Sequence, residues 1–497
     1  MKKFFYLCFC AIFCLFSTFS LTSCKKSEVE KVSKNLTSYA IQAELFDDMK
    51  ISGTERVVFY NSTGKELDFV CFHLYPRAFR EGALVKPYTS LTSAKCFPNG
   101  VGFGDISILK VKVNGEVKSF EHIGEDEDIL KVNLGFKLTQ KKSVEIVIEF
   151  LIVIPNSTHR FGWCDENVNL GNWYPIVCAF KNGSFDTTPY FATGDPFFSE
   201  IGNYEVSLTY PIQYNLCSTG ESVTTKNGNK STTKMTAKAV RDFAICLSSS
   251  SRVVCDDVDG VTVRYMSKEK DEQMNKFLNV SIEALKFFSK TFGKYPYSTL
   301  SVVQTPFIYG GMEYPNLVFI SDAIDDEKEY LKVVVHEVAH QWWYAIVGNN
   351  EVNDAWLDES LSEYSTALFF KNHGKYEIAY DDLVNDALAS YLLYVDVIKT
   401  LRGEVNTKMN LPVNEYQNDY EYSYMVYVKG VIMFDSLKNV VGEKKVIAGL
   451  KKYYADNKFK VATKEDFFKA FKSACHKDLD GFFDGFLNGT TIISKIN

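Results

Sequence analysis

The sequence predicts a multidomain protein in which an all-β region comes first and a mainly helical region follows. With 497 residues the chain is long enough for two or three domains, each with its own apolar core. Apolar residues alternate with polar ones up to about Met266, and beyond it they recur every three or four positions. Apolar residues make up 46% and charged residues 24%, so a disordered chain is excluded.

The first 24 residues have the pattern of a targeting segment. Lys2 and Lys3 precede an apolar stretch over 4–19, which is too short and wrongly flanked for a membrane span. The tetrapeptide that ends at Cys24, Leu-Thr-Ser-Cys, resembles a bacterial lipoprotein signal, in which the cysteine is lipidated. We therefore expect 1–24 to be a signal peptide and the chain to be exported to the cell envelope and lipid-anchored to a membrane. The alternative is an ordinary secretory signal and a secreted protein.

Residues 25–266 are expected to form one all-β domain. Apolar side chains occupy every second position in 144–154 and again in 204–210, which is typical of half-buried strands. The dipeptides Asn114-Gly115 and Asn227-Gly228 lie between such runs and favour type I′ hairpin turns.

A helical pattern begins near Ser267. Apolar residues between Met274 and Phe292 are spaced by three, four or seven, and Gly293 is placed to end that helix. A short apolar strand over 300–303 follows, then Gly-rich sequence, then mainly helical patterns. We place a domain boundary after residue 266, a second unit over 267–375 and a helical C-terminal part over 376–497.

Charge and cysteine content exclude several classes of site. The formal net charge is −7 and no basic stripe is present, so we expect no nucleic-acid partner. Eight cysteines follow Cys24, which permits disulfides in an exported chain without fixing their pattern. None lies in a CxxC pair, so a thiolate zinc site has no support.

The segment from His336 to His340 reads His-Glu-Val-Ala-His and follows an apolar run. On a helix, two histidines at i and i+4 stand on one face, and both imidazoles can reach one ion about 2 Å away. Glu337 lies beside the first histidine and can face a metal-bound water without binding the metal. We expect it to be the general base that takes the proton from that water.

A third metal ligand is expected at Glu359, in the segment Trp-Leu-Asp-Glu-Ser that opens another helical pattern. Two imidazoles and one carboxylate leave the fourth position open, as a catalytic zinc requires. We therefore predict one Zn²⁺ per chain. Asp358, as the adjacent residue, should point elsewhere, and Glu363, one turn further on, is either a carboxylate that supports a ligand or part of a solvated helix face.

Four motifs resemble one family, the gluzincin metallopeptidases of the membrane alanyl aminopeptidase type, relatives of leukotriene hydrolases. They are Gly-Gly-Met-Glu-Tyr-Pro at 310–315, the HExxH at 336–340, the Trp-Leu-Asp-Glu context of Glu359, and Tyr-Val-Lys-Gly at 427–430. The resemblance implies a saddle-like N-terminal β domain, a thermolysin-like α+β zinc catalytic domain over 267–375 and a short helical C-terminal part.

The same resemblance implies roles for substrate-binding residues. Glu313 would hold the free α-amine of a peptide, and Tyr427 would donate a hydrogen bond to the oxyanion. Gly310, Gly311 and Met312 would form an edge strand along which the peptide backbone pairs.

Three features depart from the family pattern. Tyr314 stands where the family usually has Asn, directly after the amine-binding Glu313. The β domain should supply a further polar group to the amine pocket, for which Glu166 and Asn169 are the candidates. Little more than 60 residues follow Gly430, so we expect a more open active site than in longer relatives.

The expected function is zinc-dependent peptide hydrolysis, most simply the removal of N-terminal residues. An endopeptidase or another hydrolase on the same zinc, such as an epoxide hydrolase, is the alternative among enzymes. A surface-binding lipoprotein that kept the fold without turnover is the alternative from another class. The preferred side chain at the cleaved position and the oligomeric state have no signal in the sequence.

Overall fold

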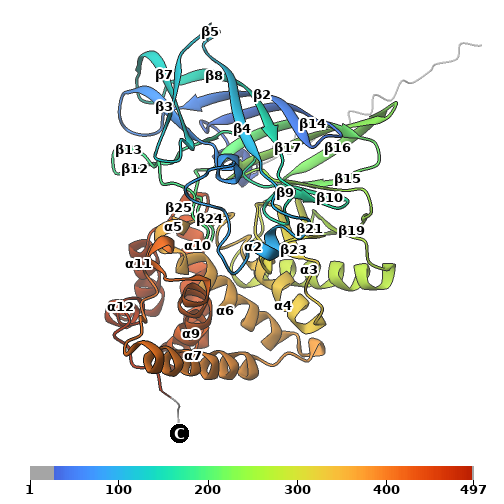
Figure 1. Cartoon of the computed structure of the whole chain (residues 1–497). Helices are drawn as coiled ribbons and strands as arrows, with labels where there is room; N and C mark the ends of the chain where they lie inside the picture. The colour runs from blue at the N-terminus through green and yellow to red at the C-terminus, as the bar shows by residue number, and fades with distance from the viewer. Residues whose placement is uncertain (1–26, 495–497) are drawn as a thin grey trace, which may run out of the picture.

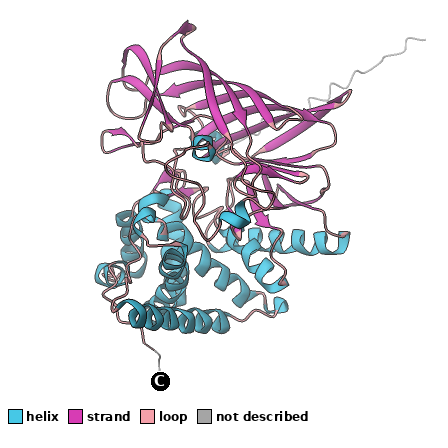
Figure 2. Cartoon of the chain, in the orientation of Figure 1, coloured by secondary structure: helices cyan, strands magenta, loops and turns pink. Residues whose placement is uncertain are grey.

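The computed structural model describes residues 27–494. Strands dominate the N-terminal half and helices the C-terminal half, and the two parts lie one above the other (Figures 1 and 2). The expected signal peptide and Cys24 lie outside the described residues. Within 27–494, no helix combines the length and apolar character needed to span a membrane.

The largest sheet of the β region has eight strands in the order β16-β17-β14-β1-β2-β8-β4-β5, antiparallel except for the pair β1 and β14. Its strands are β1 (Ser38–Leu45), β2 (Lys50–Tyr60), β4 (Asp105–Val113), β5 (Glu116–Val117), β8 (Ser143–Val153), β14 (Gly202–Pro211), β16 (Glu221–Asn227) and β17 (Lys230–Val240). Alternation decides which face is buried: Ile146, Ile148 and Phe150 of β8 are fully buried, as their period-two spacing predicts.

Two smaller sheets and a hairpin complete the β region. One sheet consists of β15 (Asn215–Ser218), β18 (Ile245–Ser248), β10 (Asn167–Leu170) and β9 (Phe161–Cys164). The other consists of β11 (Ile176–Val177), β3 (Leu67–His73), β7 (Ile129–Leu138) and β6 (Phe120–Ile123). The hairpin pairs β12 (Phe180–Lys181) with β13 (Ser184–Phe185).

One of the two predicted hairpin turns differs in register. Asn114 and Gly115 both have positive φ, 47° and 85°, as a type I′ turn requires. In the second hairpin Asn227 pairs with Lys230, so the two turn residues are Gly228 and the one that follows it. Only Gly228 has positive φ (59°), so the glycine occupies the first turn position and the predicted type I′ turn is wrong there.

A five-stranded sheet in the order β19-β20-β21-β23-β22 joins the β region to the helices. Its strands are β19 (Arg252–Val258), β20 (Val261–Ser267), β21 (Thr299–Thr305), β22 (Gly311–Met312) and β23 (Leu317–Ser321). Because β20 pairs in parallel with β21, this sheet includes strands on both sides of residue 266. The residue boundaries of the domains stay predictions.

Helices form the lower half of Figure 1. They are α3 (Asp271–Thr291), α4 (Glu327–Ala339), α5 (Glu351–Asp354), α6 (Trp356–Asn372), α7 (Tyr380–Arg402), α8 (Asp419–Ser423), α9 (Lys429–Val441), α10 (Glu443–Asn457), α11 (Lys464–Cys475) and α12 (Asp480–Leu487). Two short helices, α1 (Glu28–Val32) and α2 (Ser93–Cys96), lie in the β region. Among the helices, β24 (Val347–Gly348) pairs with β25 (Lys460–Val461). The α3 helix ends before Gly293, which has φ 153°, as predicted. The predicted fold class is confirmed.

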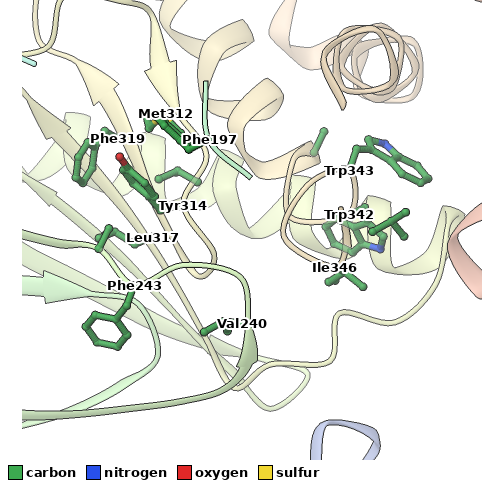
Figure 3. Close-up of a cluster of buried hydrophobic side chains, with 14 of the residues drawn as sticks. Phe197, Val240, Phe243, Met312, Tyr314, Leu317, Phe319, Trp342, Trp343 and Ile346 are labelled. Carbon is green, nitrogen blue, oxygen red and sulfur yellow. The ribbon is translucent and has the colours of Figure 1, made fainter. Parts of the chain in front are cut away.

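Buried large side chains come from the five-stranded sheet and from the segment that follows α4 (Figure 3). Tyr314 packs edge-on against Phe319, with ring centroids 5.4 Å apart. On the far side of α4, the indole N–H of Trp342 donates to the carbonyl of Gly293 at 2.8 Å. The segments that precede and follow the helix with the His-Glu-Val-Ala-His sequence are therefore each held in the core.

All eight cysteines of the described residues are free thiols, and seven of them are buried. The exception, Cys255, is exposed.

Candidate metal centre and substrate cavity

The α4 helix places His336 and Glu337 in its last turn, and His340 caps its C-terminus. Its start is fixed by Asp326, whose side chain accepts a hydrogen bond from the Glu329 backbone N–H at 2.8 Å. Valines on one face of α4 are buried in the core. Because this packing fixes the orientation of the helix, both histidines lie toward α6.

The three predicted ligands meet at one point. The Nε2 atoms of His336 and His340 are 2.9 Å apart, and each lies 3.1 Å from Oε2 of Glu359. Donors about 2.0–2.1 Å from a tetrahedral zinc ion lie roughly 3.3 Å from one another. The spacing of the three donor atoms therefore suits one zinc ion.

The protonation of His340 supports the same conclusion. Its Nδ1 lies 2.9 Å from the carbonyl oxygen of Trp343, which can only accept, so Nδ1 carries a hydrogen and Nε2 is the ring nitrogen available to a metal. Two imidazole nitrogens and a carboxylate oxygen from buried side chains thus face one another at the cavity. Such donors repel unless a cation lies among them, so the residues fit the predicted zinc.

The two other carboxylates near Glu359 have different roles. Glu363 is half-buried, and its Oε1 lies 3.4 Å from Nδ1 of His336, within ion-pair distance but without a hydrogen bond, so its carboxylate lies beside a ligand. Asp358 points elsewhere, as predicted: its Oδ1 accepts a hydrogen bond from the backbone N–H of Glu359 at 3.0 Å.

Glu337 faces the cavity beside the metal ligands and is only 5% exposed. Burial, reinforced by the charge of Glu313, raises the pKa of its carboxyl well above the ordinary value. The position depends on a glycine, because a Cβ at Gly311 would lie 2.3 Å from Oε1 of Glu337. The close approach of strand and base therefore requires residue 311 to have no side chain.

Gly311 and Met312 form β22, which pairs with β23 at the edge of the five-stranded sheet, so the predicted edge strand is present. Gly310 and Gly311 line the cavity. Met312 does not: it is fully buried, and its sulfur accepts a hydrogen bond from Nε of Arg160 at 3.1 Å. Its side chain therefore supports the cavity wall from behind.

Glu313 lines the cavity and lies next to a residue that the sequence did not single out, Asp195. Oxygen atoms of Asp195, Glu313 and Glu359 lie within 4.8 Å of one another. The two candidates from the β domain are wrong for this position. Glu166 is exposed, and Asn169 donates to the carbonyls of His159 and Pro306, away from the cavity lining.

Arg160 holds Asp195 in place. Its guanidinium forms an ion pair with the Asp195 carboxylate and also donates to the carbonyl of Gly194 at 3.1 Å. The rings of Tyr309 and Phe197 lie 5.0 and 5.3 Å from the guanidinium carbon. No motif in the sequence marks Arg160 or Asp195, because each acquires its role only when the β domain packs against the metal centre.

Tyr427 lies in a π-helical turn (Tyr424–Val428) between α8 and α9, a feature often found at functional sites. Its hydroxyl donates to Oε1 of Glu359, the oxygen that does not face the histidines. Residue 430 must be glycine for a steric reason, because a Cβ there would lie 2.4 Å from Oγ of Ser360. The Lys-Gly context of Tyr427 therefore allows α9 to approach α6, which carries the third ligand.

Tyr314, which replaces the usual Asn, is not in the amine pocket. Its ring is fully buried and its hydroxyl donates to Oδ1 of Asn172 at 2.8 Å. The phenol fits only because residue 171 is glycine, where a Cβ would lie 1.9 Å from the hydroxyl oxygen. The substitution thus changes the core behind the site and leaves the Glu313 carboxylate facing the cavity.

These groups surround a cavity of about 440 Å³ between the β domain and the helices. It is lined from the β domain by Arg160 and Asp195, from the edge strand by Gly311, and from the helical part by Tyr422 and Tyr427. A buried zinc-type centre with one open side, a nearby carboxylate base and an extended edge strand define the class of zinc metallopeptidases.

Comparison with known proteins agrees with this class. Residues 277–486 match the model of the peptidase family M1 domain. This match confirms the resemblance read from the four motifs.

Similar curated proteins include human endoplasmic reticulum aminopeptidase 2, 26% identical over 246 residues, which cover 45% of this chain and 25% of that protein. Leukotriene A-4 hydrolase from Xenopus laevis is 22% identical over 392 residues, which cover 75% of this chain and 62% of that protein. The chain therefore spans less than two thirds of the length of these relatives.

Among solved structures, the M1 zinc metallopeptidase from Deinococcus radiodurans has a TM-score of 0.63 at 14% identity. The match covers 92% of this chain and 94% of that structure, so the two share their fold over nearly the whole length.

Proposed function

We propose that this protein is a zinc-dependent aminopeptidase that removes N-terminal residues from peptides. The observation that carries the proposal is the position of two carboxylates, Asp195 and Glu313, within 4.8 Å of an oxygen of the metal ligand Glu359. In a peptide, the free α-amine and the first carbonyl carbon are separated by a single Cα, a span of about 2.5 Å. A free ammonium held by these carboxylates would therefore bring the first peptide bond to the metal centre.

The chain's own residues supply the steps of hydrolysis. A bound zinc ion would polarise the scissile carbonyl and lower the pKa of water. Glu337 accepts the proton of the attacking water and passes it to the leaving amine. Its buried carboxyl has a raised pKa, which suits a group that must hold a proton between the two steps.

Two further groups orient the substrate. The edge strand β22 has an unpaired side to which an extended peptide can add by backbone hydrogen bonds. The phenol of Tyr427 donates a hydrogen bond to the oxygen that gains charge in the tetrahedral intermediate, after leaving its partner Glu359.

Names of similar proteins support the choice of substrate. Human and Candida albicans relatives are called aminopeptidases, and one solved Deinococcus radiodurans structure contains a Tyr-Ser-Ala substrate. The carboxylate pair favours a free amine over an internal peptide bond, which weighs against the endopeptidase alternative. The complete set of ligands and base weighs against a binding protein without turnover.

A panel of fluorogenic amino-acid amides, measured with and without a chelator and compared with N-acetylated peptides, tests the proposal. We expect chelator-sensitive cleavage of the free amides and at least tenfold slower cleavage of the acetylated substrates. Equal rates on both would favour an endopeptidase on the same zinc. No hydrolysis by zinc-replete protein would favour the binding protein.

We also propose that the chain is exported and lipid-anchored to a membrane of the cell envelope through Cys24. The support is the lysine pair, the apolar stretch and the Leu-Thr-Ser-Cys tetrapeptide of the first 24 residues. Cys24→Ser should move the protein from the membrane fraction to the soluble fraction, because acyl chains on Cys24 would be the anchor. Retention in the membrane fraction would mean another tether.

A further inference from the structure

A second group of buried carboxylates lies next to the metal centre, behind the cavity lining. Glu313, Glu351 and Asp358 each place an oxygen within 4.8 Å of the other two. They come from three elements, since Glu313 follows the edge strand, Glu351 begins α5 and Asp358 lies in the first turn of α6. Their exposed fractions are 3%, 1% and 1%.

Three of the six oxygens of this group are buried and have no hydrogen-bond partner among the described residues. Both oxygens of Glu351 and Oε1 of Glu313 are buried without a donor among the described residues. Only Asp358 has a donor, the Glu359 backbone N–H. Buried polar atoms in folded proteins are almost always paired, so orphaned carboxylate oxygens that converge on one point indicate a missing partner.

Nearby arginines cannot be that partner. Arg241 influences Glu351, but its guanidinium donates to the backbone carbonyls of Tyr344, Ser199 and Lys460. Arg160 influences Glu313 but forms its ion pair with Asp195. Both guanidinium groups are therefore engaged elsewhere.

The charges around the centre do not balance with zinc alone. One zinc ion and Arg160 supply three positive charges. Six buried carboxylates face one another across the metal centre and the second group: Asp195, Glu313, Glu337, Glu351, Asp358 and Glu359. A substrate ammonium would neutralise one of the three remaining negative charges, and a proton or a further cation must neutralise the charge buried behind the cavity lining.

We propose that Glu313, Glu351 and Asp358 bind a second cation, a divalent ion of the calcium type. Carboxylate oxygens are the ligands of hard cations, and Glu351 and Asp358 with two oxygens each and Glu313 with one supply five of the six to eight oxygens that Ca²⁺ takes. One oxygen from each of the three carboxylates lies within 4.8 Å of the other two, close enough for one ion to contact all three. Mg²⁺ keeps several waters, which a site closed to solvent does not provide.

The ion would act on substrate binding through Glu313. By holding one oxygen of this carboxylate, it leaves the other directed into the cavity, so Glu351 and Asp358 are positioning residues. The existence of the ion site does not rest on the proposed aminopeptidase function, because the three carboxylates would bind the ion whichever bond the enzyme cleaves.

The test uses the full-length zinc-loaded protein, freed of other ions, with Ca²⁺ alone as the probe. Metal content after equilibrium dialysis, and the unfolding temperature along a Ca²⁺ titration, are compared for wild type, Glu351→Gln and Glu55→Gln. Glu55 is a matched control, since both of its oxygens are buried and unpartnered but it lies in β2 of the β domain.

We expect wild type and Glu55→Gln to bind one Ca²⁺ besides zinc and to unfold at a higher temperature as Ca²⁺ is added. Glu351→Gln should keep its zinc and lose both effects. If Glu351→Gln does not fold, the stoichiometry of the wild type alone decides. Zinc without a second ion in the wild type, or Ca²⁺ binding that Glu351→Gln leaves unchanged, would overturn the proposal, because protons would then neutralise the group.

Discussion

Replacement of Glu313 by Gln tests how the enzyme recognises the end of its substrate. The carboxylate is 3% exposed, so a substrate ammonium that pairs with it forms a charge-assisted bond with little screening. Such a bond contributes about 1.5–3 kcal/mol, and each 1.36 kcal/mol changes a rate tenfold. We therefore expect Glu313→Gln to lower kcat/KM on free amino-acid amides about ten- to a hundredfold.

The assay compares each amide with its N-acetylated analogue, on which Glu313→Gln should have little effect. The loss should also depend on pH. An α-amine has a pKa of about 7.7–8.0, so the bond exists below this pH and disappears as the substrate loses its proton. The difference between variant and wild type should thus shrink at higher pH. An equal loss on free and acetylated substrates at every pH would refute the assignment of Glu313 to the ammonium.

Four further substitutions address the metal centre and the base. Glu337→Gln should keep zinc but lose several orders of magnitude in turnover, since an amide cannot accept the proton of water; near wild-type activity in a zinc-replete variant would reject the base. Glu359→Ala should lose the metal, and an undiminished zinc stoichiometry would exclude it as a ligand. Tyr427→Phe should lower turnover about 10²- to 10³-fold with zinc retained, whereas an unchanged rate would mean that the phenol only supports Glu359. Gly311→Ala should displace Glu337 and reduce kcat with zinc retained, while Gly310→Ala, whose new Cβ would have no neighbour closer than 3.6 Å, serves as its control; equal effects of the two would contradict the steric argument.

The metal site could be read from the sequence because its geometry is local. Helical periodicity places His336 and His340 on one face, and α4 delivers both imidazoles to within 2.9 Å of each other. The prediction of Glu359 as the third ligand required one assumption about the tertiary structure, that the next helix returns to the first. Its Trp-Leu-Asp-Glu context made that assumption specific. The all-β character of the first half followed equally directly from period-two alternation, which survives in the buried faces of strands such as β8.

Other parts of the site have no local signal. Asp195 and Arg160 lie far from the motifs in the sequence, and Glu166 and Asn169 were the wrong candidates because strand pairing, not proximity in sequence, decides which loop meets Glu313. The turn predicted at Asn227-Gly228 lies one residue further along the chain for a similar reason. Pairing along the whole of β16 and β17 fixes the register of the two strands, and the turn must fit that register.

The sequence by itself determined the helix with two ligands and a base, the third ligand, the order of β and helical regions, and the acidic, cysteine-poor chemistry of the site. Each of these depends on residues that are near one another along the chain, where backbone geometry alone sets the spacing. Only the tertiary structure decided that Asp195 lies beside Glu313 at the cavity, that Tyr314 packs away from it, and that Glu351 and Asp358 converge behind Glu313. Those contacts join segments whose approach is set by the packing of the β domain on the helices, a property that no short stretch of sequence contains.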